Sequence, residues 1–291
     1  MTWRTVYISS QCHLSFKNNY LIVRGDEVKM IHMSELNTLI IDNNASSIST
    51  YLLNELIKNK VKVMVCDEKH NPSFELIPYH TAYNSSKVIM DQISWDQAAI
   101  QETWKQIIIA KIKYQARVLQ KYGFEEWEKL QAYTADILPG DPTNREGFAA
   151  KVYFNRLFGN DFYRDDDEET ANAFLNYGYI VLLSMFNREI VNAGYLTQIG
   201  IHHIGITNPF NLSCDLMEPF RPVVDQFAYD HRALDLNKDT KIELIGYMNK
   251  KVQYDGESVF LSQAVREYVG HILSNLSRKS VEQKWFVYGE E

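Results

Sequence analysis

The stretch WDQAAIQETWKQIIIAKIKYQARVLQKY, residues 95–122, separates two parts of the sequence that follow different periodicities. Apolar residues recur in it at the spacing of one face of an α-helix. Further amphipathic patterns cover residues 145–158, 170–193, 215–230 and 258–276. KKVQYDGESVFL, residues 250–261, departs from these patterns, and its Tyr-Asp-Gly turn between strand-like pieces predicts a hairpin. Apart from this hairpin, the sequence after residue 92 is predicted to be helical.

Residues 1–78 have the pattern of strands joined by short turns. YLIV and VKMIHM flank the turn pair Gly25-Asp26, and TLIIDN and VKVMVCD are apolar and rich in β-branched residues. Between the last two, SISTYLLNELIKNK has its apolar residues at helical spacing. We predict an α+β protein: a small, mostly antiparallel β-sheet or sandwich domain with one helix over 1–78, a polar linker over 79–91, and a larger all-helical domain over 92–291.

The composition is that of a globular protein, with 45% hydrophobic residues. No run approaches the roughly 18 apolar residues of a membrane span. The first residues, MTWRTVYISSQCHLSF, lack the apolar core of a signal peptide. Cys12, Cys66 and Cys214 are too few and too scattered for a disulfide framework, which favours a reducing compartment. We expect a cytoplasmic protein with no membrane partner.

The formal net charge of −7 argues against nucleic acid as a partner, because phosphate-binding domains usually carry a basic excess. Residues 104–121 nevertheless contain five basic residues and no acidic one. A solvated helix face and a stripe facing DNA both explain that segment, and composition alone does not choose between them.

Three places in the predicted helical domain hold residue types that bind metals. Glu146 opens one predicted helix, and His202 and His203 lie in the Gly-flanked stretch QIGIHHIG. Asp215 and Glu218 are three residues apart, and so share one side of a helix if that segment is helical. Carboxylates with one imidazole suit Mg²⁺ or Mn²⁺ rather than zinc. Surface or structural roles explain the same residues equally simply.

The run DDDEE, residues 165–169, is a denser group of carboxylates than this constellation. It immediately precedes an amphipathic pattern, and acidic residues favour the positive end of the helix dipole. We interpret the run as a solvated helix start and not as a site.

Several longer motifs carry a family resemblance. They are LSFKNNYL (14–21), NREGFAAKVYFNRLFG (144–159), NAFLNYGY (172–179), GIHH (200–203) and FNLSCDLMEPFRP (210–222). Together they resemble the CRISPR-associated integrase, the larger subunit of the spacer-acquisition machinery, and most closely its type II branch. The motifs occur in order and span nearly the whole chain, which makes the resemblance far more specific than any single motif.

The resemblance implies a metal-dependent DNA endonuclease and integrase that inserts short foreign DNA fragments into a CRISPR array by transesterification. Its metal ligands fall on Glu146, His203 and Glu218, with Mg²⁺ or Mn²⁺ as the cofactor, and Asp215 supports the catalytic site. Many relatives carry aspartate where Glu218 stands. The resemblance also implies a homodimer, with dimer and partner contacts through the N-terminal domain, bound to a small protein of ferredoxin-like fold and to double-stranded DNA.

Basic residues around these positions are candidates for the DNA path: Arg145, Lys151, Arg156 and Arg221. Phosphate contacts of this kind position a duplex without reading its sequence. Pairing of Arg145 and Arg221 with the ligand carboxylates or with the acidic run is the alternative. A different class of function also stays open, namely a non-enzymatic helical scaffold that binds DNA or a protein.

Overall fold

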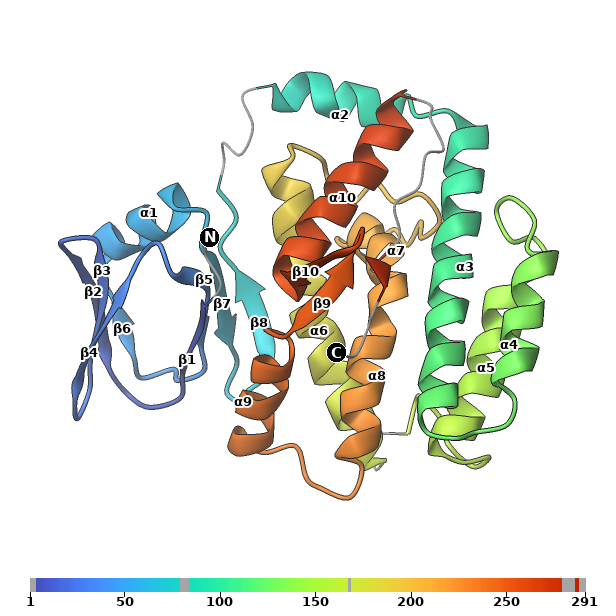
Figure 1. Ribbon diagram of the computed structural model, residues 1–291. Helices are drawn as coiled ribbons and strands as arrows, with labels where there is room; N and C mark the ends of the chain where they lie inside the picture. The colour runs from blue at the N-terminus through green and yellow to red at the C-terminus, as the bar shows by residue number, and fades with distance from the viewer. Residues whose placement is uncertain (1–3, 79–83, 167–168, 279–285, 288–291) are drawn as a thin grey trace. The chain divides into compact units, whose positions relative to one another are not determined.

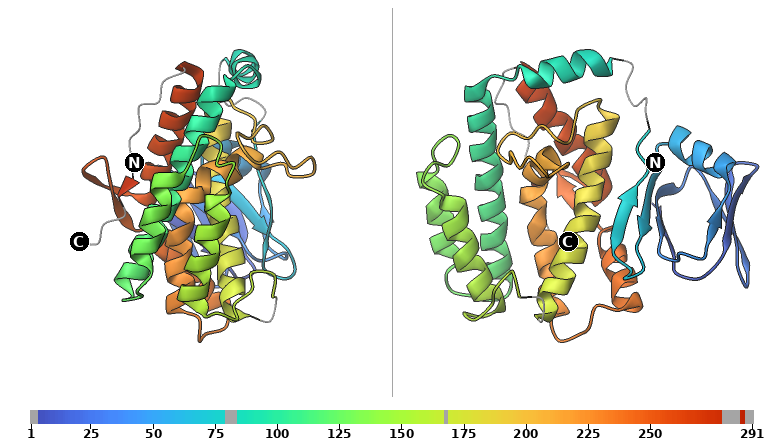
Figure 2. Two further views of the ribbon diagram at one scale, coloured as in Figure 1. Left: turned by 90° about the vertical axis from the view of Figure 1, so that its right-hand side faces the viewer. Right: turned by 180° about the vertical axis from the view of Figure 1, so that it is seen from behind.

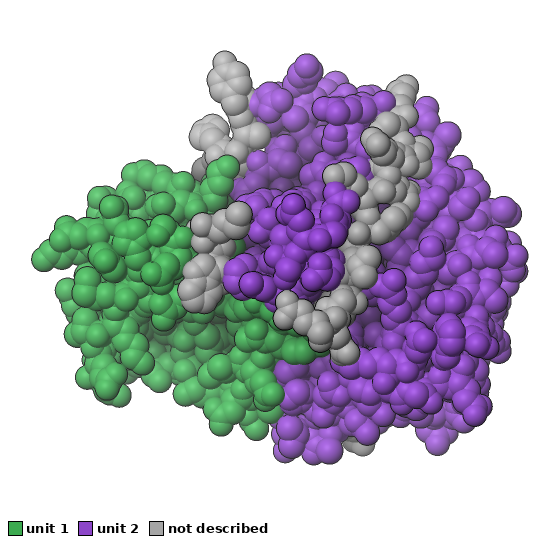
Figure 3. All heavy atoms as spheres, viewed as in Figure 1, with its two compact units in different colours: residues 1–79, 237–250 green, residues 80–236, 251–291 purple. Residues whose placement is uncertain are grey.

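The computed structural model describes residues 4–78, 84–166, 169–278 and 286–287. The chain forms two compact units, residues 1–79 with 237–250 and residues 80–236 with 251–291 (Figure 3). The architecture is a β-sheet region followed by a mainly helical region, as predicted. The segment 237–250, which the prediction placed in the helical domain, belongs to the N-terminal unit.

The N-terminal unit contains two four-stranded sheets (Figure 1). The first has the order β1 (Arg4–Ile8), β5 (Leu36–Ile41), β7 (Lys62–Cys66) and β8 (Pro72–Glu75). The second has the order β4 (Val28–His32), β3 (Tyr20–Arg24), β2 (His13–Lys17) and β6 (Ser47–Ile48). Buried side chains of both sheets and of helix α1 (Thr50–Lys58) form one hydrophobic core, which includes Leu14, Leu21, Leu39, Leu52 and Val63. The unit is therefore a sandwich with one helix packed into its core.

The prediction of a mostly antiparallel arrangement is wrong for the first sheet. Strands β1, β5 and β7 are parallel to one another, and only β8 runs antiparallel to its neighbour. Parallel neighbours need a crossover connection, which α1 supplies between β5 and β7. In the second sheet, β2, β3 and β4 are antiparallel as predicted. Asn18 and Asn19, both at positive φ, make the two-residue turn between β2 and β3.

Helix α9 (Lys238–Tyr247) completes the N-terminal unit. The Lys241 ammonium donates to the His70 carbonyl oxygen at 2.6 Å. Ile245 packs with Ile40, Met64 and other buried side chains of the first sheet. A helix far along the sequence thus belongs to the β unit through contacts that local periodicity does not reveal.

The second unit contains most of the helices, and Figure 2 shows them from two further sides. They are α2 (Ser85–Ile93), α3 (Gln97–Lys121), α4 (Trp127–Tyr133), α5 (Arg145–Phe158), α6 (Thr170–Asn192), α7 (Asn211–Met217), α8 (Arg221–Asp230) and α10 (Leu261–Arg278), with short 3₁₀ turns η1 (Thr134–Asp136) and η2 (Glu218–Phe220). Helix α3 lies between α4 and α5 on one side and η2 and α8 on the other (Figure 1). The helix that the opening stretch predicts is therefore the one that connects the parts of the candidate site.

Two local predictions for this unit have clear outcomes. The hairpin is confirmed, with β9 (Lys251–Tyr254) and β10 (Glu257–Phe260) joined by Asp255 and Gly256, both at positive φ. Strand β11 (Phe286–Val287) also pairs with β9. The segment predicted as a linker, 79–91, contains most of α2 from residue 85 onward, and residues 79–83 lie outside the described part. None of the described helices is both long enough and apolar enough to span a membrane.

Candidate active site

Glu146 lies in the first turn of α5, where side chains from the preceding turn fix the backbone. The Asn144 side chain caps the helix by accepting from the Gly147 amide. The buried Asp141 carboxylate accepts from the amides of Arg145 and Glu146, both at 2.9 Å. These bonds satisfy helix-start amides that have no partner within the helix. The direction in which Glu146 leaves the helix is therefore set by the chain before it.

Glu218 lies at the junction between α7 and α8. The single helix predicted for 215–230 is divided there into α7, η2 and α8, with Pro219 in the first turn of η2 and Pro222 in the first turn of α8. Proline lacks an amide hydrogen and is tolerated at a helix start. The prolines therefore stand where the helix is interrupted, and the interruption places Glu218 with only 3% of its surface exposed.

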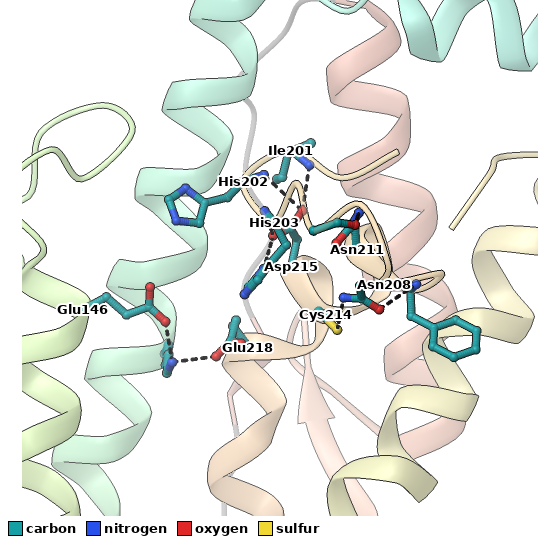
Figure 4. A network of polar contacts seen from close by, with 12 residues as sticks. Glu146, Ile201, His202, His203, Asn208, Asn211, Cys214, Asp215 and Glu218 are labelled. Carbon is teal, nitrogen blue, oxygen red and sulfur yellow. Dashed lines mark hydrogen bonds and ion pairs between the residues drawn. The ribbon is translucent and has the colours of Figure 1, made fainter. Parts of the chain in front are cut away.

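Lys111 of α3 joins the two glutamates, Glu146 and Glu218, which are labelled in Figure 4. Its ammonium nitrogen lies 2.6 Å from Glu146 Oε1 and 2.6 Å from Glu218 Oε2. Burial lowers the pKa of Lys111, but the charges of Glu218 and Glu146 outweigh it and raise the pKa above its ordinary value. The structure therefore brings the predicted glutamates from α5 and η2 to one positive charge.

Arg221 makes the second ion pair of Glu218, with Nε 2.9 Å from Oε1. Its guanidinium lies over the Tyr179 ring, 4.6 Å from the centroid. Burial alone would raise the pKa of Glu218, but the charges of Arg221 and Lys111 lower it to about 2. Glu218 is therefore a carboxylate at any physiological pH.

Asp215 organises the histidine loop. Its carboxylate is fully buried and accepts from the amides of Ile201 at 2.6 Å, His202 at 3.1 Å and His203 at 3.0 Å. It also accepts from His203 Nδ1 at 2.6 Å. The hydrogen bond to Asp215 raises the pKa of His203, although burial opposes it. One aspartate thus fixes both the loop backbone and the orientation of the imidazole, which leaves Nε2 of His203 as its outer nitrogen.

Gly200 is required by this arrangement. A Cβ atom there would lie 2.4 Å from the carbonyl oxygen of His203 and 2.7 Å from Asp215 Oδ2. The first atom belongs to the loop backbone and the second is held by the amides of Ile201 and His202, so neither has much room to move. The close approach explains the glycine that opens the GIHH motif.

The two adjacent histidines have different surroundings. The His202 ring stacks on Trp104 of α3, with centroids 4.0 Å apart and planes 4° apart. The His203 ring is held by Asp215 and faces the region of Glu218 and Glu146 (Figure 4). The geometry supports the choice of His203 over His202 as the site histidine.

The predicted metal ligands suit a hard divalent cation in donor type. Two carboxylates and one imidazole are ligands that Mg²⁺ and Mn²⁺ accept, and the hydrogen bond from Nδ1 to Asp215 is the usual way of orienting a ligand histidine. Within residues 4–78, 84–166, 169–278 and 286–287, however, no three His, Cys, Asp or Glu side chains are grouped as ready metal ligands. Lys111 lies between two of the three predicted ligands instead.

The candidate DNA-contacting residues differ in their availability. Arg221 pairs with Glu218 and Arg156 with Glu126. Arg145 lies 3.7 Å from Asp136 and over the ring of Tyr133. The alternative of internal pairing thus holds for Arg221, whereas the partner of Arg145 is neither a ligand carboxylate nor the acidic run. Lys151 is exposed on α5.

Sequence reasoning missed Lys111 and Trp104. Both lie on α3 within the basic stretch 104–121, for which the sequence predicts either a solvated helix face or a stripe facing DNA. The signal was the helical spacing, because Trp104, Ile108 and Lys111 fall on one face and all are buried. A lysine on the apolar face of a helix requires a buried anionic partner, and that requirement points to the glutamates.

The chain matches the family model described as "CRISPR associated protein Cas1" over residues 6–251. It therefore belongs to the Cas1 family. It is 28% identical over 290 residues to the CRISPR-associated endonuclease Cas1 of Neisseria meningitidis, covering 97% of this chain and 95% of that protein. It is 26% identical to a CRISPR-associated endonuclease Cas1 of Francisella tularensis subsp. novicida, covering 88% and 90% of the two chains.

Solved structures share this fold. A Cas1 protein from Thermotoga maritima aligns with a TM-score of 0.75 at 16% identity, covering 99% of this chain and all of that one. A casposase bound to integration product aligns with a TM-score of 0.76 at 19% identity, covering 97% and 92%. The Cas1-containing chain of a Cas6-RT-Cas1–Cas2 complex aligns with a TM-score of 0.72 at 18% identity, covering 95% of this chain and 35% of that one.

Proposed function

We propose that this protein is a divalent-metal-dependent DNA endonuclease and integrase of the type II branch, which inserts short foreign DNA fragments into a CRISPR array. The observation that carries the proposal is the convergence of Glu146 and Glu218 on the ammonium of Lys111, beside His203, which the buried Asp215 orients. Membership of a family whose curated members are named CRISPR-associated endonucleases supports the assignment.

Glu146, Glu218 and His203 would hold the cofactor, Mg²⁺ or Mn²⁺. When bound, such a cation polarises a phosphate and stabilises the negative charge that develops during phosphodiester transfer. The charges of Arg221 and Lys111 keep Glu218 ionised, so it is available as a ligand without prior deprotonation. Asp215 keeps Nδ1 of His203 occupied, so Nε2 is the nitrogen presented to the site.

The proposed assembly includes other molecules. The solved neighbours include a casposase bound to integration product and a Cas6-RT-Cas1–Cas2 complex. By this likeness we propose that the chain acts in the cytoplasm as a homodimer, with a small Cas2-type partner of ferredoxin-like fold and double-stranded DNA. Arg145 and Lys151 on α5 are then the better candidates for phosphate contacts, because Glu218 holds Arg221 within the site and Arg156 lies closer to its partner Glu126 than Arg145 does to Asp136.

A strand-transfer assay tests the proposal. Purified chain and partner are incubated with a fragment DNA and a repeat-bearing plasmid, and joined products are counted with Mg²⁺, with Mn²⁺ and with a chelator. A fragment that ends in a 3′-deoxy nucleotide is the matched control, because transesterification needs the 3′-hydroxyl. We expect products only with the metal and the intact 3′ end. Products that persist with chelator would overturn the metal-dependent mechanism, and DNA binding without any cut or joined product would favour a scaffold.

A further inference from the structure

We infer that Lys111 is a positioning residue that holds Glu146 and Glu218 together in the metal-free protein and competes with the divalent cation for them. The inference rests on the proposed function, since it concerns the same site. It adds a regulatory element: the affinity for metal is set by a competing ammonium group as well as by the ligands.

The first support is geometric. Lys111 Nζ is 2.6 Å from an oxygen of each glutamate, and its side chain is only 10% exposed. Two carboxylates held this close to each other repel one another unless a positive charge lies between them. The ammonium of Lys111 supplies that charge. Lys111 therefore stabilises the same convergence of carboxylates that a divalent cation would need.

The second support is the balance of charge. Glu146 and Glu218 face the ammonium of Lys111, Glu218 also faces the guanidinium of Arg221, and Asp215 faces the imidazole of His203. Two positive charges, those of Lys111 and Arg221, thus lie among three carboxylates. A divalent cation entering this group gains much more attraction if one positive charge withdraws.

The third support is the choice of residue. Arg221 is held by both Glu218 and the Tyr179 ring, so it is fixed in place. The ammonium of lysine is a compact charge on a flexible four-carbon stem, which can swing away without moving the helix. Of the two cations at Glu218, Lys111 is therefore the one suited to exchange with a metal.

The test measures metal binding and stability without relying on catalysis. Mn²⁺ affinity of the full purified chain is determined from the electron paramagnetic resonance signal of free Mn²⁺, and Tm is recorded with and without Mn²⁺. The variants are Lys111→Met, which removes the charge, and Lys111→Arg, which keeps it. Lys105→Met is the matched control, because Lys105 lies on the same helix and its ion-pair partner is Glu102.

We expect Lys111→Met to bind Mn²⁺ at least tenfold more tightly than wild type, whereas Lys111→Arg and Lys105→Met stay within threefold. Without metal, Lys111→Met should have the lower Tm, and Mn²⁺ should raise its Tm more than that of wild type. Unchanged or weaker affinity in Lys111→Met, with equal loss of Tm in both conditions, would overturn the inference by showing a purely structural ion pair.

Failure of the proposed function gives a different result. If Glu146→Gln leaves Mn²⁺ binding unchanged, or if neither wild type nor Lys111→Met binds Mn²⁺, the assignment of the metal ligands is wrong. The inference about Lys111 is then wrong as well. Should Lys111→Met fail to unfold cooperatively, Lys111→Gln, which retains an uncharged polar group, replaces it in the same comparison with the same expected increase in affinity.

Discussion

The two units each contain a buried aspartate that accepts a hydrogen bond from Nδ1 of a histidine. In the helical unit Asp215 holds His203 at 2.6 Å, and in the N-terminal unit Asp42 holds His70 at 3.0 Å. Asp42 also accepts from the Tyr7 hydroxyl and lies near the buried Cys66, whose pKa is raised to about 12 by burial and by Asp42. The local chemistry of the two pairs is therefore similar.

The surroundings of the two pairs differ. Around His203, Glu146 and Glu218 converge from two further elements. Around His70, the ammonium of Lys241 donates to the His70 backbone carbonyl. An Asp–His pair by itself therefore serves to fix a histidine in either unit. The glutamates that converge near His203 are what make that pair a candidate active site.

The largest expected loss of strand-transfer rate is for variants of the two glutamates, and it should exceed the loss for variants of His203 and His70. Glu146→Gln and Glu218→Gln should each lower the strand-transfer rate at least about 1,000-fold, or about 4 kcal/mol in activation free energy, because each removes a charged ligand. The double variant should be little worse, since both residues act through one ion. Rates are measured in the joined-product assay.

Glu126→Gln is the control for these glutamates, because it removes a carboxylate that pairs with Arg156 outside the site. Its rate should stay within a few-fold of wild type. Near-normal rates for either Glu146→Gln or Glu218→Gln in Mg²⁺ or Mn²⁺ would contradict the site.

Loss of stability should also distinguish the aspartates. Asp215→Asn turns one acceptor oxygen into a donor that faces loop amides, and should lower the free energy of unfolding by about 3 kcal/mol. Asp42→Asn has the Tyr7 hydroxyl, the His70 imidazole and the Cys66 thiol to accommodate but no loop amides, and should cost about 1 kcal/mol. Chemical denaturation of both variants at equal protein concentration checks the ranking. Equal losses would show that Asp215 has no special role in holding its loop.

The histidines provide the next comparison. His203→Ala should lower the strand-transfer rate about 100-fold, or about 2.7 kcal/mol, whereas His70→Ala should leave it within threefold. Mn²⁺ affinity should fall only for His203→Ala. If His70→Ala proved to be the inactive variant while its fold is intact, the Asp42 pair and not the Asp215 pair would be functional.

The smallest effect concerns the neighbour of His203. His202 stacks on Trp104 and should act through packing, so that His202→Ala lowers Tm and reduces the rate less than tenfold, or about 1.4 kcal/mol. His202→Phe should restore much of the Tm by keeping a ring on Trp104. An inactive His202→Ala with weakened Mn²⁺ binding would mean that the site histidine had been assigned one position too late.

Much of the fold follows from the sequence where periodicity is local. The helix at 145–158 and the hairpin at 250–261 come from side-chain spacing and turn residues that act within a few positions. The parallel pairing of β1, β5 and β7, and the place of α9 in the N-terminal unit, depend on contacts between segments far apart in sequence. Hydrophobic spacing says which face of an element is buried but not which element covers it.

The site shows the same limit. The residue types of Glu146, His203, Asp215 and Glu218 are visible in the sequence, and their roles came from the family motifs. Spacing alone could not show that α3 supplies an ammonium between two of them, because Lys111 is 35 residues from Glu146 in the chain. Nor could it show that Asp215 bonds three successive amides, since those bonds depend on how the loop folds back.

The central claim is that Glu146, Glu218 and His203 hold one divalent cation. Crystals of the protein soaked in Mn²⁺, with diffraction recorded at the manganese absorption edge, test it most directly. The account predicts an anomalous peak within ligand distance of Glu146, Glu218 and Nε2 of His203, with the Lys111 ammonium no longer between the carboxylates. Lys111 still bridging both glutamates at saturating Mn²⁺, with no peak there or with a peak beside Asp42 and His70 instead, would contradict it.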